Sequence, residues 1–137
     1  MKLAICTDVF ADLSYTDMLD KVKSLGIDAV EMTAGGWGAR KHCNTAELLA
    51  DEGKRKEFMG ELEKRGMRIS ALNTSCNPLW PSKTGEEYKK SMYDCATLAG
   101  LLGVKKIVAM AGLPAGSETD TTPNWITSTV SWPDFMA

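Results

Sequence analysis

The amino-acid sequence predicts an α/β protein built around a parallel sheet. Short apolar stretches alternate along the chain with segments that carry apolar residues at helical spacing. Gly26, Gly66 and Gly103 recur at nearly equal intervals, and each ends a helical segment just before an apolar stretch. Such alternation is typical of parallel sheets with right-handed crossovers. Two architectures fit this pattern, a doubly wound open sheet and a (β/α)8 barrel.

Four strands are expected, and they lie at residues 3–6, 28–32, 68–72 and 105–110. The segment after the last strand is rich in Gly, Pro, Ser and Thr and shows no periodicity. The chain is therefore expected to divide into residues 1–112, which form three and a half βα units, and residues 113–137, an irregular loop or tail.

Three helical regions are expected between these strands, the second of them in a short and a longer piece. Each region opens with a capping side chain and an acidic residue three positions later: Ser14 with Asp17, Asn44 with Glu47, and Thr84 with Glu87. Their buried faces are expected to comprise Met18, Leu19, Val22 and Leu25, then Phe58, Met59 and Leu62, then Tyr88, Met92, Cys95, Ala96, Ala99 and Leu102.

Composition indicates an ordinary soluble domain. The 137 residues are 25% charged and 44% hydrophobic, with a net charge of −2 that provides no basic field for nucleic acid. No apolar run approaches the roughly 20 residues that cross a membrane, and the start reads as a strand, so a cytoplasmic location is expected. The four cysteines form no C-x-x-C pair, which favours reduced, partly buried thiols over structural zinc.

The loop after the second strand carries the most chemistry. Glu31 lies near the end of that strand, and Gly35, Gly36 and Gly38 then let the backbone approach another group closely. All four tryptophans, Trp37, Trp80, Trp125 and Trp132, fall in strand-to-helix loops. In a barrel these loops gather at the carboxyl-terminal mouth, where active sites lie. The alternative is that the tryptophans only cover the core.

Several segments resemble the sugar phosphate isomerase/epimerase family, the xylose-isomerase-like TIM barrels. They are Val30-Glu31 with Gly35-Gly36-Trp37 and His42-Cys43, residues 69–73 with Asn77-Pro78-Leu79, residues 103–108, and residues 122–125. The resemblance implies an N-terminal half of such a barrel, a partial (β/α)8 fold of about four parallel strands and three helices, because a whole barrel takes about 250 residues.

The resemblance also implies the isomerisation or epimerisation of a sugar or polyol with a divalent metal such as manganese. In the family two Glu, an Asp and a His hold this metal, and they belong to the half not represented here. No metal ligand is therefore carried over, and we expect this chain to bind no metal tightly and to lack activity alone. Two alternatives remain: a non-catalytic half-barrel that acts by association, and an abasic-site endonuclease, which a single His42 and the negative charge disfavour.

The substrate-facing candidates are Glu31, Trp37, His42, Asn73 and Trp125. Each has a structural alternative: a paired carboxylate for Glu31, a loop-ordering hydrogen bond for His42, and an Asx-turn for Asn73. Two candidates are weaker: Asp8, whose structural alternative is a local turn, and the glycines of residues 112–116, which could cradle a phosphate. Finally, the free sheet edges and the inner face predict a homo-oligomer, with the apolar groups of residues 113–137 as the alternative cover.

Overall fold

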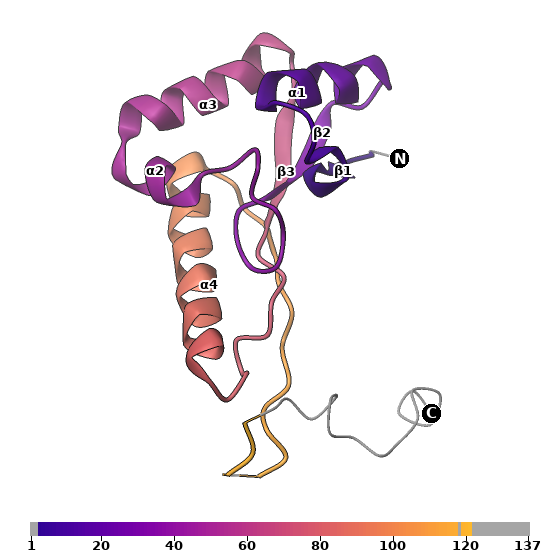
Figure 1. The fold of residues 1–137 in the computed structure, drawn as a ribbon. Coiled ribbons are helices and arrows are strands. Elements are labelled where there is room, and N and C mark those ends of the chain that lie inside the picture. Colours follow the sequence, from indigo (N-terminus) through magenta and orange to yellow (C-terminus); the bar gives the residue numbers. More distant parts are fainter. Residues whose placement is uncertain (1–2, 118, 122–137) are drawn as a thin grey trace.

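One parallel sheet organises the chain. The computed structural model describes residues 3–117 and 119–121 (Figure 1). The sheet has the order β1-β2-β3-β4, and its strands are β1 (Ile5–Cys6), β2 (Ala29–Thr33), β3 (Arg68–Asn73) and β4 (Ile107–Val108). The order in space follows the order in sequence, as in a barrel, whereas a doubly wound sheet reverses direction at a switch point. The predicted parallel α/β sheet is confirmed.

In the described residues four α-helices and one 3-10 helix connect the strands, and the second of the three expected helical regions forms two helices, which correspond to its expected short and longer pieces. The helices are η1 (Thr7–Phe10), α1 (Tyr15–Ser24), α2 (Thr45–Ala50), α3 (Glu52–Lys64) and α4 (Lys83–Leu102). The second helical region is split because Asp51 is extended, with φ −126° and ψ 117°, and its side chain accepts a hydrogen bond from the Lys54 amide. None of the helices in the described part of the chain is long and apolar enough to span a membrane.

Local signals fix most of the helix boundaries. Ser14 caps α1 and Asn44 caps α2, each accepting a hydrogen bond from the backbone N–H three residues later. Gly26, Gly66 and Gly103 have φ values of 75°, 59° and 68°, the left-handed conformation that favours glycine after a helix. The cap of α4 is Ser82, whose side chain accepts from the Thr84 amide, so the prediction of Thr84 as the cap is wrong.

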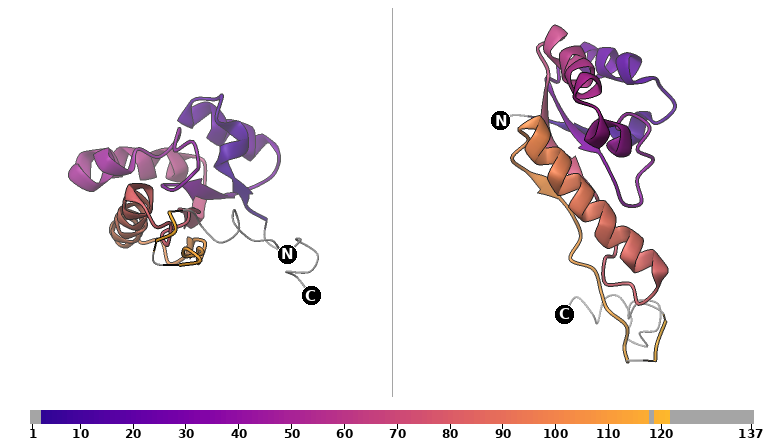
Figure 2. Two further views of the ribbon diagram at one scale, coloured as in Figure 1. Left: turned by 60° about the horizontal axis from the view of Figure 1, so that its bottom comes forward. Right: turned by 90° about the vertical axis from the view of Figure 1, so that its left-hand side faces the viewer.

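The helices pack on one side of the sheet, as both views in Figure 2 show. A single buried cluster joins the strand residues Val30, Met32 and Leu72 to residues of all four helices. Two residues of the expected faces, Leu25 and Ala96, are exposed, and Leu98, which was not predicted, is fully buried. Leu25 follows the last residue of α1, so it no longer points along the helix face.

The opposite side of the sheet is called here the inner face. A bulge in β3 determines which side chains of that strand point toward it. Val30 pairs with Ile69, but Glu31 pairs with Ala71, so Ser70 is an extra residue. The Ser70 hydroxyl donates to the Val30 carbonyl oxygen at 2.9 Å. After this shift Leu72 pairs with the buried Met32 on the helix side, while Asn73 pairs with Thr33 on the inner face.

Candidate functional site

Glu31 and Asn73 meet on the inner face, close to the carboxyl ends of β2 and β3. The Asn73 Nδ2 donates to the Glu31 Oε1 at 2.6 Å, and both side chains remain partly accessible. The Asn73 Oδ1 accepts from the Ser75 amide at 2.8 Å, which is the Asx-turn expected as the structural alternative. One amide therefore orients the carboxylate and the following loop at once, and this brings two of the candidate residues together.

Polar side chains of β1, η1 and β2 lie beside this pair, and those of Thr7 and Thr33 are buried. The Thr33 amide donates to the Thr7 Oγ1 at 3.2 Å, and the Cys6 Sγ lies 3.8 Å from the Thr33 Oγ1. A Cβ placed on Gly38 would meet both the Thr33 methyl and the Asp8 carboxylate, so the loop after β2 passes directly over these two residues. Thr33 was not among the expected site residues, although its position two residues after Glu31 in the strand places it on the same face.

The glycines after β2 serve the packing of two loops. The amides of Ala34 and Gly35 donate to the Asn73 carbonyl oxygen, and that of Trp37 donates to the Ser75 carbonyl oxygen. The Gly36 amide donates to the Ser91 Oγ at 2.9 Å. A Cβ on Gly36 would lie 2.3 Å from the Ser75 carbonyl oxygen. The close approach predicted for this loop is therefore to the loop after β3, and its four successive amides are used within the protein.

Trp37 and His42 are separated by this arrangement. The Trp37 ring is 49% exposed and packs edge-on against Tyr88 of α4, with the ring centroids 6.2 Å apart. His42 is buried, and its Nε2 lies 3.1 Å from the Leu13 carbonyl oxygen, to which it donates. That contact joins the entry of α2 to the segment before α1, which is the loop-ordering role given as the alternative.

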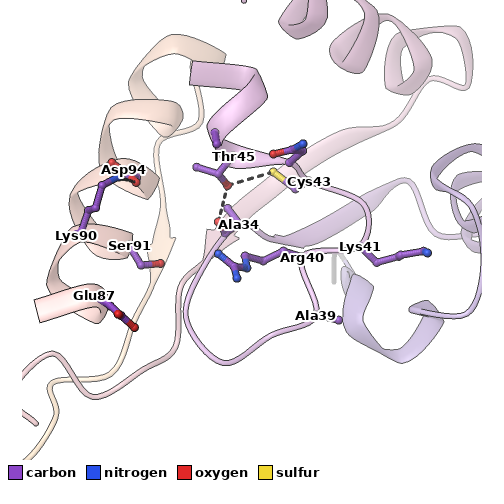
Figure 3. Close-up of a pocket in the computed structure, with 12 residues that line it drawn as sticks. Ala34, Ala39, Arg40, Lys41, Cys43, Thr45, Glu87, Lys90, Ser91 and Asp94 are labelled. Atoms are coloured by element: carbon purple, nitrogen blue, oxygen red, sulfur yellow. Dashed lines mark hydrogen bonds and ion pairs between the residues drawn. The ribbon is translucent and has the colours of Figure 1, made fainter. Parts of the chain in front are cut away.

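A cavity of about 660 Å³ lies between α4 and the segment 34–46, but it contains none of the candidate residues. Figure 3 shows Arg40 and Ser91 extending toward it, while Lys41 points away. Arg40 has φ 48°, unusual for a residue with a side chain. Lys90 and Asp94 on the same wall pair with each other at 2.5 Å. Burial raises the pKa of Cys43, also in the wall, to about 11, so its thiol stays protonated at neutral pH.

The remaining candidates add little to the site. Trp125 lies outside the described residues. The Leu113 amide donates to the Oδ1 of the fully buried Asn77 at 2.9 Å, so this amide of the glycine-containing segment faces a side chain. Among residues 3–117 and 119–121, no group of three or more His, Cys, Asp or Glu side chains is placed to hold a metal ion. Within these residues the inner-face carboxylate of Glu31 therefore has no companion ligands.

Comparison with known proteins gives one curated relative and several structural neighbours. No protein-family model matches the chain. The sequence is 52% identical over 136 residues to the uncharacterized protein YfiH of Bacillus subtilis (strain 168). The match covers 99% of this chain and 44% of YfiH, so the chain spans less than half the length of this relative.

Two solved structures share the fold. The probable 3-DHS dehydratase AsbF involved in petrobactin synthesis, from Bacillus anthracis, aligns with a TM-score of 0.57 and 21% identity, over 82% of this chain and 39% of AsbF. A xylose isomerase domain containing protein from Salmonella typhimurium LT2 aligns with a TM-score of 0.51 and 19% identity, over 90% of this chain and 40% of that protein. These alignments show that the chain has the fold of the xylose-isomerase-like TIM barrels, with four successive strands of a parallel sheet.

Proposed function

We propose that this chain forms the substrate-facing part of an enzyme that isomerises or epimerises a sugar or polyol. The observation that supports this is the Glu31–Asn73 pair on the inner face of a TIM-barrel sheet, near the carboxyl ends of adjacent strands. Active sites of this fold lie at that end of the strands. A carboxylate and an amide in this position suit the hydroxyl groups of a polyol, since one accepts and the other donates hydrogen bonds.

In this proposal Glu31 accepts a hydrogen bond from a substrate hydroxyl, and Asn73 fixes the direction in which the carboxylate points. Trp37 lies half exposed in the loop after β2. In this proposal its ring offers an apolar face to the carbon skeleton of the sugar. The loop after β2 is held by backbone contacts to the Asn73 and Ser75 carbonyl oxygens and to the Ser91 hydroxyl, so Ser75 and Ser91 position the binding groups without contacting the substrate.

A divalent metal is the cofactor expected from the resemblance, and the described residues do not suit it. They provide Glu31 but no group of three acidic, His or Cys ligands, so no step of the reaction is assigned to a metal on this chain. Isothermal titration of the 137-residue chain with Mn²⁺ is expected to show no tight site. Submicromolar binding at one equivalent would contradict this expectation.

Exchange of the carbon-bound proton next to a substrate carbonyl is the most general readout of such an enzyme. The chain is mixed with a polypeptide that covers the unmatched remainder of YfiH and incubated with Mn²⁺ and a panel of ketoses and polyol ketones in D₂O. We expect deuterium incorporation by the mixture and none by the chain alone. The variant Glu31→Gln should lower the rate at least about tenfold, because the hydrogen bond to a charged acceptor is lost.

The matched control is Glu63→Gln, which changes an exposed carboxylate on α3 in the same way. It should leave the exchange rate unchanged. A mixed complex, verified by sedimentation, that neither exchanges a substrate proton nor forms an isomerised or epimerised product would contradict the proposal, as would an unaffected rate in Glu31→Gln. Loss of water from the substrate, detected as an unsaturated product in the same spectra, would instead favour a dehydratase, the activity in the printed name of the AsbF neighbour.

A further inference from the structure

The cavity between α4 and the segment 34–46 has charges of opposite sign on its two walls. Arg40 lies in the wall formed by the loop after β2, and its guanidinium extends toward the cavity (Figure 3). Glu87 lies in the other wall, on α4. Within the described residues neither side chain forms a hydrogen bond or an ion pair, although the neighbouring Glu86 pairs with Lys89 at 2.6 Å. Two unpaired charges therefore line one cavity of about 660 Å³.

The backbone at Arg40 is strained. Its φ of 48° makes it the one non-glycine residue with a positive φ among residues 3–117 and 119–121. Side chains other than those of Asn and Asp are disfavoured in this conformation, because the Cβ atom lies too close to the following carbonyl oxygen. No hydrogen bond or ion pair of the Arg40 side chain within these residues offsets that strain. Strain of this kind is found mainly at binding and catalytic sites, so the arginine is better explained by a ligand than by the fold.

Hydrogen bonds hold the loop wall of the cavity in place. The Gly36 amide donates to the Ser91 Oγ of α4 at 2.9 Å, and the Thr45 Oγ1 of α2 donates to the Ala34 carbonyl oxygen at 2.5 Å. The first bond joins the loop directly to the opposite wall, and the second joins its start to the next helix. The cavity is therefore formed before any ligand enters, which lowers the entropic cost of binding.

A molecule that carries both a positive and a negative charge matches this cavity best. A simple anion would be attracted by Arg40 but repelled by Glu87, and a simple cation would meet the reverse. A zwitterion can pair with both side chains at once. The lining also includes Ala34, Ala39 and Ala46, which offer apolar contact to the carbon chain between the charged groups.

We propose that this cavity binds a small zwitterion of the amino-acid class, with its carboxylate paired to Arg40 and its ammonium group paired to Glu87. The site is separate from the polar pair on the inner face, since neither Glu31 nor Asn73 lines the cavity. The inference goes beyond the proposed function and does not depend on it.

A series of ω-amino acids from glycine to 6-aminohexanoate tests the site, with binding to the 137-residue chain followed by heteronuclear NMR. The length that spans the two charges should bind with a Kd on the order of 1 mM and shift the amide signals of residues 34–46 and 87–94. Two analogues of that length carry one charge each: the N-acetyl derivative keeps the carboxylate, and the carboxamide keeps the ammonium group. Both should bind at least about tenfold more weakly. Equal binding of either analogue, or no binding in the series below about 20 mM, would overturn the proposal.

Substitutions at the two charges identify the surfaces that bind. Arg40→Asn removes the cation but suits a positive φ, so this variant should fold as stably as the wild type and bind the zwitterion at least about tenfold more weakly. Glu87→Gln should weaken binding to a similar extent. The matched controls are Lys41→Gln, whose side chain points away from the cavity in Figure 3, and Glu86→Gln, which does not line it; both should bind like the wild type. Unchanged binding in Arg40→Asn or in Glu87→Gln would overturn the assignment of the site.

Discussion

The two faces of the sheet differ in how far the chain itself completes them. On the helix side Val30, Met32 and Leu72 are fully buried against side chains from every α-helix. On the inner face Glu31, Asn73 and Cys6 stay partly accessible and contact one another or a neighbouring strand by polar groups. The helix side therefore accounts for the stability of this fold, whereas the inner face provides the groups available to a ligand or a partner.

Substitution at the helix side should have the largest effect. Leu72→Ala removes a fully buried side chain at the centre of the sheet and should lower the free energy of unfolding by about 2–5 kcal/mol. Leu101→Ala is the matched control, since this leucine on α4 is exposed. Urea denaturation followed by circular dichroism measures both. Equal losses in the two variants would mean that the helix side does not form the core.

Substitution in the loop after β2, which contacts the loop after β3, should have the next largest effect. Gly36→Ala places a Cβ against the Ser75 carbonyl oxygen at a residue with φ 69°, and both strain and overpacking should lower the free energy of unfolding by about 2–4 kcal/mol. Gly26→Ala has the same backbone strain, φ 75°, but no atom within 4 Å of the new Cβ, so a loss of about 1 kcal/mol is expected. Thermal or urea midpoints that match for the two variants would exclude the tight contact between loops.

On the inner face, Asn73→Asp should have a smaller and pH-dependent effect. The new carboxylate still accepts from the Ser75 amide but now faces the Glu31 carboxylate, so the free energy of unfolding at pH 7 should fall by about 1–2 kcal/mol. Repulsion raises the pKa of one carboxyl in the folded variant above its value in the unfolded chain. The folded variant then binds a proton more tightly, so its deficit is full at neutral pH and shrinks as the pH falls toward about 4.

The control for this prediction is Asn44→Asp, an exposed cap of α2 whose side chain accepts from the Glu47 amide. An aspartate serves equally well at that position, so this variant should unfold like the wild type at both pH values. A pH-independent deficit in Asn73→Asp would show that the two carboxylates do not meet in the folded chain.

The smallest expected effect is a difference between cysteines in the rate at which a thiol reagent modifies them. Burial raises the pKa of Cys43 and of Cys95 to about 11, and both lie in the buried cluster on the helix side. Cys6, on the inner face, is only partly buried. At pH 8 iodoacetamide should modify Cys6 first, and Cys43 and Cys95 only in urea, as measured by mass spectrometry of peptides. Early modification of Cys95 in the native chain would contradict the packing of α4.

Features with a local cause were predictable from the sequence. The glycines at 26, 66 and 103 terminate helices through their own conformation, and Ser14 and Asn44 cap through the amide three residues away. The strand positions and their parallel order followed from these signals. The prediction of Thr84 as the cap of α4 was wrong because Ser82 and Thr84 are both suitable cap residues. Only the course of the chain after Trp80 selects between them.

Features that depend on distant segments were not predictable. Nothing near Gly36 indicates that its neighbour is the Ser75 carbonyl oxygen or that Ser91, 55 residues away, accepts its amide hydrogen bond. The contact between Glu31 and Asn73 likewise depends on the register of two strands, although each residue was identified singly as a candidate. Glu31 and Asn73 were thus predictable as polar residues of the inner face, whereas Thr33 and the contacts between these side chains were not.

The bulge at Ser70 matters for anyone who aligns, grafts or shortens this strand. Counting β3 by twos from Arg68 assigns Leu72 to the inner face and Asn73 to the helix layer, the reverse of the observed arrangement. Deleting Ser70 would restore the regular alternation and leave Leu72 and Asn73 on their observed faces, so the strand tolerates this change better than a deletion elsewhere in β3. A relative that lacks the extra residue must therefore be aligned with a one-residue gap at Ser70, because without the gap its residues beyond Ile69 are compared with residues of the opposite face.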